Sequence, residues 1–153
     1  ALWKHFEWPE PLASPPKSAG ETLGDLMGAG GWEGAAEWAD SANAIAPTIV
    51  GGSKKHGGPD LGPTRAKKAW EALGVCGHGI ADAPPHPGFR GRPRLTVRMV
   101  ARLQGFPDSW EFVGKKTAAY RQVGNAFPPP VAEAVSKKIA AALAKAEPSR
   151  LAS

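Results

Sequence analysis

Only one stretch of this sequence has the pattern of a β-strand, and that scarcity limits what the chain can build by itself. Ala44–Val50 is an apolar run with β-branched residues at positions 45, 48, 49 and 50, a composition that favours a strand. A parallel sheet needs several strands joined by helical crossovers, so these 153 residues cannot form a Rossmann-type sheet alone. We therefore expect an α+β fragment, helix-rich, with long loops and little sheet.

Capping residues and glycines mark the expected helices. Ser18 and Glu21 have the spacing of a capping box, which predicts a short helix over Thr22–Met27. Further helices are expected over residues 64–73, 96–104 and 117–124, each begun by the threonine at or next to its start. Gly105 is expected to end the second of these in a left-handed conformation.

A last helix should follow Pro128–Pro130 and continue to about Lys145. Its apolar residues recur at i, i+4 spacing, which places them on one face; they are Val131, Val135, Ile139 and Leu143. An uncovered apolar stripe of this kind favours association. We expect another chain or another part of the same protein to cover it, with self-association of the isolated chain as the alternative.

The charge is divided unevenly along the chain. The first fifty residues hold two bases and seven acids, a net charge of −5, whereas the remainder holds 17 bases and 7 acids, a net charge of +10. A basic region of this kind is typical of a surface that neutralises phosphates. An ordinary solvated basic surface is an equally good interpretation of the charge alone.

The bases cluster around a glycine-rich loop and the helix after it. Three of them lie in the first turn of the helix expected over 64–73, where the helix dipole disfavours cations unless an anion is nearby. A solvated helix face is again the alternative. The candidate contacts with a nucleic acid in this region are Ser53, Lys54, Lys55, His56, Arg65, Lys67, Lys68, Arg90, Arg92 and Arg94.

The single cysteine excludes an internal disulfide and fits a reducing compartment. Cys76, His78 and His86 do not have a metal-ligand spacing, so no metal site is expected. No apolar run is long enough to cross a membrane, and we expect a cytoplasmic protein with no membrane partner. Because the chain begins at Ala1 rather than Met, we expect a fragment of a longer protein, with a processed native start as the alternative.

Two motifs resemble those of the cytosine-5 DNA methyltransferases. Arg94-Leu-Thr-Val-Arg-Met-Val-Ala-Arg-Leu-Gln-Gly-Phe-Pro-Asp-Ser-Trp110 resembles the family's ninth motif, the helix and turn that organise the DNA-recognition domain. Ala119-Tyr-Arg-Gln-Val-Gly-Asn-Ala-Phe-Pro-Pro-Pro-Val-Ala132 resembles the tenth motif, where the chain returns to the large domain and touches S-adenosylmethionine. The resemblance implies that the chain completes an α/β Rossmann-like methyltransferase fold when joined to an N-terminal part.

The same resemblance implies roles for particular residues. Thr48-Ile49 resembles the pair whose threonine contacts a phosphate beside a flipped cytosine. Gly124, Asn125 and Ala126 correspond to the cofactor-contacting part of the tenth motif, and glycine and asparagine there favour a left-handed or turn conformation. One position departs from the family: residue 99 is Met where the ninth motif has Glu, so we expect the cap at Thr96 to lose its reciprocal carboxylate.

The catalytic motifs of the family do not occur in these residues. The nucleophile belongs to a Pro-Cys-Gln sequence, whereas Cys76 lies in Gly-Val-Cys-Gly-His. No catalytic residue is therefore assigned, and the isolated chain is expected to be inactive. It would need the N-terminal catalytic part of the enzyme, in cis or in trans.

The expected organisation has three segments: residues 1–17 as a junction from the catalytic domain, 18–93 as the target-recognition region, and 94–147 as C-terminal helices. The resemblance implies the DNA-recognition and cofactor-pocket-completing part of a DNA (cytosine-5-)-methyltransferase, which methylates C5 of a flipped cytosine, as in restriction–modification systems. A non-catalytic DNA-binding module or regulatory subunit is the alternative.

Overall fold

The chain divides into two compact units. The computed structural model describes residues 2–11, 15–50 and 58–146. One unit comprises Pro16–Ala126, and the other comprises Ala1–Pro15 together with Phe127–Ser153. The division falls between Ala126 and Phe127, so the stretch that resembles the tenth motif contributes to both units.

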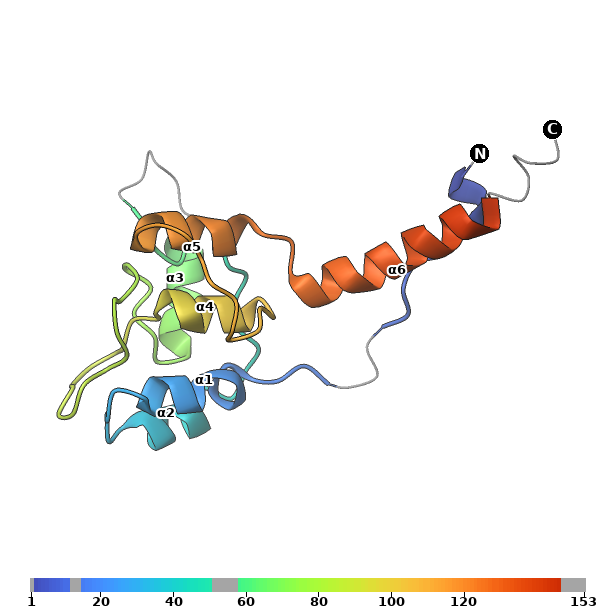
Figure 1. The fold of residues 1–153 in the computed structure, drawn as a ribbon. Coiled ribbons are helices and arrows are strands. Elements are labelled where there is room, and N and C mark those ends of the chain that lie inside the picture. The colour runs from blue at the N-terminus through green and yellow to red at the C-terminus, as the bar shows by residue number, and fades with distance from the viewer. Residues whose placement is uncertain (1, 12–14, 51–57, 147–153) are drawn as a thin grey trace. The chain divides into compact units, whose positions relative to one another are not determined.

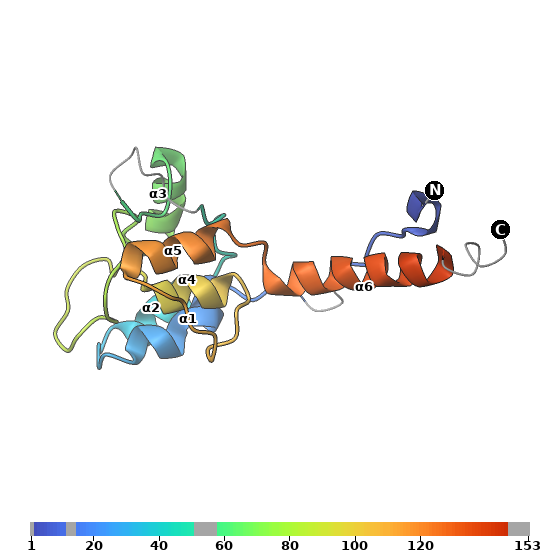
Figure 2. The same cartoon turned by 45° about the horizontal axis from the view of Figure 1, so that its top comes forward.

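The larger unit is helical. Its helices are α1 (Ala19–Gly28), α2 (Ala35–Ser41), α3 (Thr64–Ala72), α4 (Val97–Leu103) and α5 (Lys116–Asn125). Helices α1 and α2 pack side by side, and α4 lies between α1 and α5 (Figures 1 and 2). The expected helix-rich architecture with long connections is confirmed.

The expected strand over Ala44–Val50 is wrong, because none of these residues joins a β-ladder. Over the described ranges, the β-pairing consists of one isolated parallel bridge between Ala81 and Thr96. The run bonds to other groups instead: Ala44 O accepts from the backbone nitrogen of Ala19 at 2.8 Å, and Val50 O accepts from a tyrosine hydroxyl. With no neighbouring strand, the apolar run is held by a helix start and a side chain.

The start of α1 agrees with the capping box expected from Ser18 and Glu21. Ser18 Oγ accepts from the Glu21 backbone nitrogen at 3.1 Å, and Glu21 Oε2 accepts from the Ser18 nitrogen at 2.7 Å. The bond from the Ser18 backbone nitrogen, together with one from the Ser18 side chain, lowers the pKa of the Glu21 carboxyl, because each stabilises its charged form. The helix begins at Ala19, three residues before the expected Thr22.

Two of the three threonine caps are wrong. The N-caps of α3 and α5 are Pro63 and Lys115, both in extended backbone and without a side-chain cap bond. Thr64 and Thr117 therefore lie inside the helices. Thr96 does cap α4, since its Oγ1 accepts from the Met99 nitrogen at 3.2 Å, and Gly105 follows with a left-handed φ of 83°.

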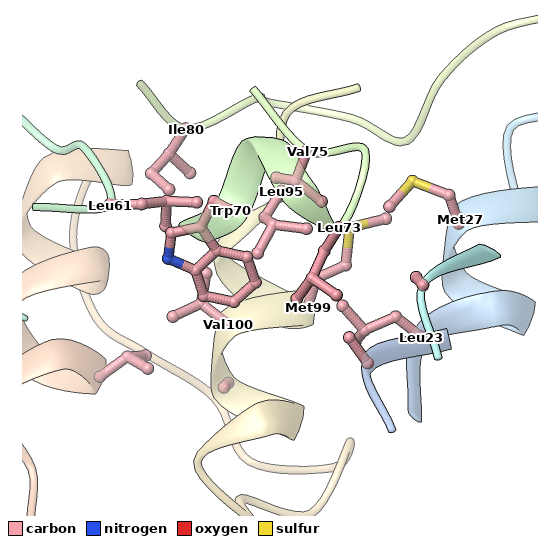
Figure 3. Close-up of a cluster of buried hydrophobic side chains, with 14 of the residues drawn as sticks. Leu23, Met27, Leu61, Trp70, Leu73, Val75, Ile80, Leu95, Met99 and Val100 are labelled. Atoms are coloured by element: carbon pink, nitrogen blue, oxygen red, sulfur yellow. The ribbon is translucent and has the colours of Figure 1, made fainter. Parts of the chain in front are cut away.

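One hydrophobic core holds the larger unit together. Trp70 of α3 lies at its centre with no exposed surface, beside Leu61, Leu95 and Val100 (Figure 3). Leu23 and Met27 bring α1 to the same cluster, and α5 contributes Tyr120 and Val123. The loops after α3 also enter the core through Val75 and Ile80, so burial fixes segments that have no regular structure.

The smaller unit pairs a long helix with a short one. Helix α6 (Pro129–Ala146) begins within the three prolines, at the second of them, and ends one residue beyond the expected Lys145. A 3-10 helix, η1, spans Leu2–His5. Trp3 and Phe6 form a groove of about 260 Å³ with Ile139, Ala142 and Leu143 of α6. A bond of 3.3 Å from Lys145 Nζ to Glu7 also ties the N-terminal segment to this helix.

Part of the α6 stripe remains open. Val131, Ile139 and Leu143 are 46%, 46% and 47% exposed, and Trp3 is 75% exposed. No helix in the part of the chain that the structure describes has the length and apolarity to cross a membrane.

Candidate functional site

The two described ends of the glycine-rich loop meet at one side chain of α5. Tyr120 donates its hydroxyl proton toward the carbonyl oxygens of Val50 and Asp60, at 2.8 and 2.6 Å. The tyrosine ring is completely buried. Burial and the nearby Asp60 carboxylate raise the Tyr120 pKa to about 12, so the hydroxyl stays protonated and remains a donor at neutral pH.

Asp60 is also fixed from the side of α3. Its carboxylate accepts from the Gly62 nitrogen at 3.0 Å and forms an ion pair with Lys67 Nζ at 2.7 Å. Lys67 is therefore engaged within the protein, whereas Arg65 and Lys68 of the same helix are exposed. Of the three bases in this turn, two are available to an outside anion and one stabilises the loop.

Three arginines lie on the loop before α4, and all are exposed: Arg90, Arg92 and Arg94. Trp32 supports this loop, because its Nε1 donates to Phe89 O at 3.0 Å and its ring meets Phe89 edge to face at 5.7 Å. Glu33 accepts from the Gly88 nitrogen at 2.9 Å. Arg92 lies 3.9 Å from Glu71, at the limit of an ion pair.

Of the remaining candidate DNA contacts, one lies within the described residues and four do not. Thr48 is exposed, two residues before Val50. Ser53, Lys54, Lys55 and His56 lie outside the described residues. Thr48, Arg65, Lys68 and the three loop arginines thus all belong to the larger unit and all reach solvent.

Arg102 joins three segments of the larger unit. Its guanidinium makes a bidentate contact with Asp108, with Nε to Oδ1 at 3.0 Å, and also contacts the carboxylate of Asp25 and the carbonyl of Thr22. The contacts lower the pKa of both aspartates and raise that of Arg102. The arginine therefore locks α1 to α4 and to the turn that begins at Phe106.

Arg98 organises the chain after that turn. It donates to the carbonyl oxygens of Pro107 and Trp110, at 3.3 and 2.6 Å, and its guanidinium carbon lies 5.9 Å from the centroid of the Phe112 ring. With Lys116, which pairs with Asp82 at 2.8 Å, it lines a cavity of about 320 Å³. Both cations are engaged within the protein, so this cavity offers no free positive charge from them.

The expected left-handed or turn conformation at Gly124 and Asn125 is wrong. Helix α5 continues through Asn125 and ends at Ala126, whose φ and ψ of −71° and 143° are extended. Gln104 Nε2 donates to Val123 O at 3.3 Å and anchors this end to the segment after α4. Asn125 is exposed, so its amide, which can both donate and accept, is open to a ligand.

Among the described residues, no group of three or more histidines, cysteines or carboxylates is placed to hold a metal ion. Cys76 is half-buried and His78 is exposed. The backbone nitrogen of Cys76 donates to Pro93 O at 2.8 Å, which gives this position a structural part in holding the arginine loop.

Sequence reasoning missed the three organising side chains. Tyr120 is one residue of the stretch that resembles the tenth motif, and Arg98 and Arg102 are two residues of the stretch that resembles the ninth. A signal existed for Tyr120, because it is the single tyrosine of the chain. Its partners lie 70 and 60 residues away in sequence, and no local pattern could have identified them.

The comparisons with known proteins identify a family. The model described as C-5 cytosine-specific DNA methylase matches residues 8–141. The chain is 66% identical over 142 residues to Type II methyltransferase M.NaeI of Lentzea aerocolonigenes, covering 91% of this chain and 34% of that protein. It is 50% identical over 144 residues to Type II methyltransferase M.NgoMIV of Neisseria gonorrhoeae, covering 92% of this chain and 45% of that protein.

A shorter match is to a plant protein. DNA (cytosine-5)-methyltransferase 2 of Arabidopsis thaliana is 55% identical over 49 residues, 32% of this chain and 3% of that protein. No solved structure matches the chain. The chain spans 34% and 45% of the two bacterial relatives.

Proposed function

Because the chain belongs to the C-5 cytosine-specific DNA methylase family, we propose that it is the DNA-recognition and cofactor-pocket-completing part of a DNA (cytosine-5-)-methyltransferase. The complete enzyme would transfer a methyl group from S-adenosylmethionine to C5 of a flipped cytosine in double-stranded DNA. The family match over residues 8–141 is the observation that carries the proposal. The names of the two bacterial relatives favour a role in restriction–modification, in the bacterial cytoplasm where the DNA lies.

The exposed bases of the larger unit supply the contacts with phosphates. Within the residues that the structure describes, Arg65 and Lys68 on α3 and the three loop arginines have no carboxylate within 4 Å apart from Glu71 near Arg92. Bases of this kind give affinity that falls steeply with salt, because each phosphate contact releases a counterion. Thr48, together with the loop that carries Ser53, Lys54, Lys55 and His56, would contact the target site, and Lys67 would act through Asp60.

The end of α5 would complete the cofactor pocket. S-adenosylmethionine carries both a carboxylate and an ammonium at its amino-acid end, and an amide can serve either. The exposed Asn125, next to the extended backbone of Ala126, fits that requirement. When bound, S-adenosylmethionine supplies the methyl group, and Gly124–Ala126 would hold its amino-acid end.

The nucleophile would come from the N-terminal catalytic part, in cis or in trans. Pro-Cys-Gln does not occur in these 153 residues, and Cys76 is placed to hold the arginine loop. The exposed face of α6, with Val131, Ile139 and Leu143, would pack on that part. Isolated chains should therefore self-associate, and a strictly monomeric solution mass would contradict this role for α6.

A chimera tests the proposed function directly. This chain would replace the matching segment of the 66% identical bacterial relative, and transfer of tritiated methyl groups to DNA would be measured. We expect the chimera to methylate DNA and the isolated chain not to. A stable chimera that binds DNA without transferring methyl groups would favour the non-catalytic DNA-binding module.

Charge reversal tests the proposed DNA surface. Arg65→Glu with Lys68→Glu should weaken duplex binding and reduce the salt dependence by about two phosphate contacts. The matched control is Lys137→Glu with Lys145→Glu, which changes the net charge equally on α6. Equal losses in both pairs would show that net charge alone governs binding.

A further inference from the structure

We propose that Tyr120 is a positioning residue for DNA recognition, holding the segment around Thr48 in register with the body of the protein. The inference rests on the proposed function, since it assigns a role within the same DNA-contacting surface. Tyr120 itself is buried and would not touch DNA. It would act through the backbone of Val50.

One hydroxyl proton lies between two carbonyl oxygens. The Tyr120 oxygen is 2.8 Å from Val50 O and 2.6 Å from Asp60 O, and a phenol has a single proton to donate. Two carbonyl oxygens that share one donor carry like partial charges and repel each other when the donor is removed. Loss of the hydroxyl should therefore separate the two chain segments as well as remove a bond.

The Asp60 side has anchors that do not depend on Tyr120. Its carboxylate binds the Gly62 nitrogen at 3.0 Å and Lys67 at 2.7 Å, and the next residue, Leu61, is fully buried and donates to Gly77 O at 3.1 Å. Residues 60–62 should consequently keep their place when the tyrosine hydroxyl is lost.

The Val50 side has fewer hydrogen bonds in the part of the chain that the structure describes, and Ile49 beside it packs against the core only partly buried. The Val50 carbonyl bonds to Tyr120, and one of the Val50 methyl groups lies against Gly62, where an added Cβ would come within 2.8 Å of it. Gly62 has a φ of 104°, so a side chain is disfavoured there twice over. When the Tyr120 hydroxyl is lost, the segment that ends at Val50 should therefore shift. Thr48 lies two residues before Val50 and should move with it.

This arrangement separates two kinds of binding. Helix α3 and the arginine loop, which carry the exposed bases, are held in place by contacts that do not involve Tyr120. The attraction of these bases to phosphates should therefore not depend on Tyr120. Contacts made by Thr48 would depend on it. Removing the hydroxyl should thus reduce discrimination between DNA sequences while leaving the salt dependence of binding unchanged.

The test uses the full chain with Tyr120→Phe. A preferred duplex is first selected from a randomised library with the wild-type chain, and a scrambled duplex of equal length serves as reference. We expect Tyr120→Phe to lower the affinity ratio between the two duplexes at least about tenfold and to keep the salt slope. Thr22→Val is the matched control, because it also removes a hydroxyl bonded to a carbonyl, that of Ser18 at 2.7 Å.

The outcomes distinguish this inference from the proposed function. A wild-type chain that selects no duplex would overturn the proposed function and the inference with it. Sequence selection by the wild type with an unchanged ratio in Tyr120→Phe would overturn the inference alone, as would an equal loss in Thr22→Val.

A second measurement covers the case in which Tyr120→Phe does not fold. Because Tyr120 is the single tyrosine of the chain, growth on 3-fluorotyrosine labels this position alone for fluorine NMR. The selected duplex should shift the resonance, and the scrambled duplex should not. A resonance that stays in place while the selected duplex binds would contradict the proposed role.

Discussion

The sulfur of Met99 accepts a hydrogen bond from the backbone nitrogen of Thr96 at 3.3 Å, while Thr96 Oγ1 accepts from the Met99 nitrogen at 3.2 Å. The reciprocal cap of α4 therefore exists with a thioether in the place of a carboxylate. The carboxylate is absent as expected, and the Met99 sulfur makes the reciprocal bond in its place. Met99 is fully buried, where a carboxylate would be costly to desolvate and a polarisable sulfur is not.

This cap predicts graded losses of stability among three variants at the start of α4. Thr96→Ala should lower the free energy of unfolding by about 1 kcal/mol, because a backbone N–H loses its acceptor. Thr96→Ser should retain most of the stability, since it keeps the hydroxyl. Met99→Leu, which keeps the volume but loses the sulfur, should cost less than about 1.5 kcal/mol. Urea unfolding of the three variants measures these differences, and an unaffected Thr96→Ala would argue against the cap.

The Arg102 contacts predict a stability that depends on acid pH. The pKa values of Asp25 and Asp108 are lowered by Arg102 from the ordinary 3.8. A lowered native pKa stabilises the fold above the unfolded value, and this contribution disappears as the pH falls through the native value. Wild type should thus exceed Arg102→Met in stability at neutral pH, and the difference should shrink below about pH 4. Denaturant unfolding at several pH values measures it.

Arg121→Met is the charge-matched control for that series. Arg121 makes no ion pair among the residues that the structure describes. The stability of the Arg121→Met variant should follow that of wild type across the same acid range. A difference for Arg102→Met that stays constant with pH would exclude the aspartates as the cause.

Tyr120 predicts a second dependence at alkaline pH. Its pKa is raised from 10.0 to about 12 by burial and by Asp60. A raised native pKa stabilises the fold fully below the unfolded value, and this contribution is lost as the pH rises from 10 toward 12. Ultraviolet titration of the single tyrosine should give the high value in the folded chain and the ordinary one in denaturant. An ordinary pKa in the folded chain would contradict the buried hydroxyl.

Close packing of α1 on α2 predicts opposite effects for two glycines of one helix. A Cβ at Gly20 would lie 1.9 Å from the carbonyl oxygen of Ala39, so Gly20→Ala should destabilise the fold by about 3 kcal/mol. At Gly28 the nearest atom is the Ala35 Cβ at 3.4 Å, an ordinary contact. Gly28→Ala should be neutral or stabilise by about 0.5 kcal/mol. Thermal unfolding compares the pair, and similar effects would refute the close approach.

A comparison of two buried tryptophans measures how much one hydrogen bond contributes to the stability of the fold. Trp38 Nε1 donates to Leu73 O at 3.0 Å, whereas Trp70 Nε1 has no partner among the described residues. Both substitutions to Phe remove the same ring atoms, but only Trp38→Phe also leaves a carbonyl unpaired. Trp38→Phe should cost about 1 kcal/mol more than Trp70→Phe in urea unfolding. The reverse order would mean that Trp70 has a donor role.

Local patterns were sufficient wherever neighbouring residues supply the bonds. The capping box at Ser18, the cap at Thr96, the glycine at 105 and the proline start of α6 each need partners within four residues, and each is confirmed. For the helices at Thr64 and Thr117 the N-cap lies one and two residues before the threonine, at Pro63 and Lys115, whose backbone is extended. These errors of one and two residues arise because neighbouring positions have similar helix propensities, so the local pattern does not fix which residue caps the helix.

The sequence by itself determined the family motifs, the helical character and the uneven charge of this protein, because motif identity, periodicity and charge are local or additive properties. Tertiary structure alone decided the rest. In the folded chain, the segment expected as a strand bonds to Ala19 and Tyr120. Lys67 pairs with Asp60, and Arg102 links α1 to α4. Each of these contacts depends on which distant groups the shared core brings within about 3 Å, and no spacing along the chain encodes that distance.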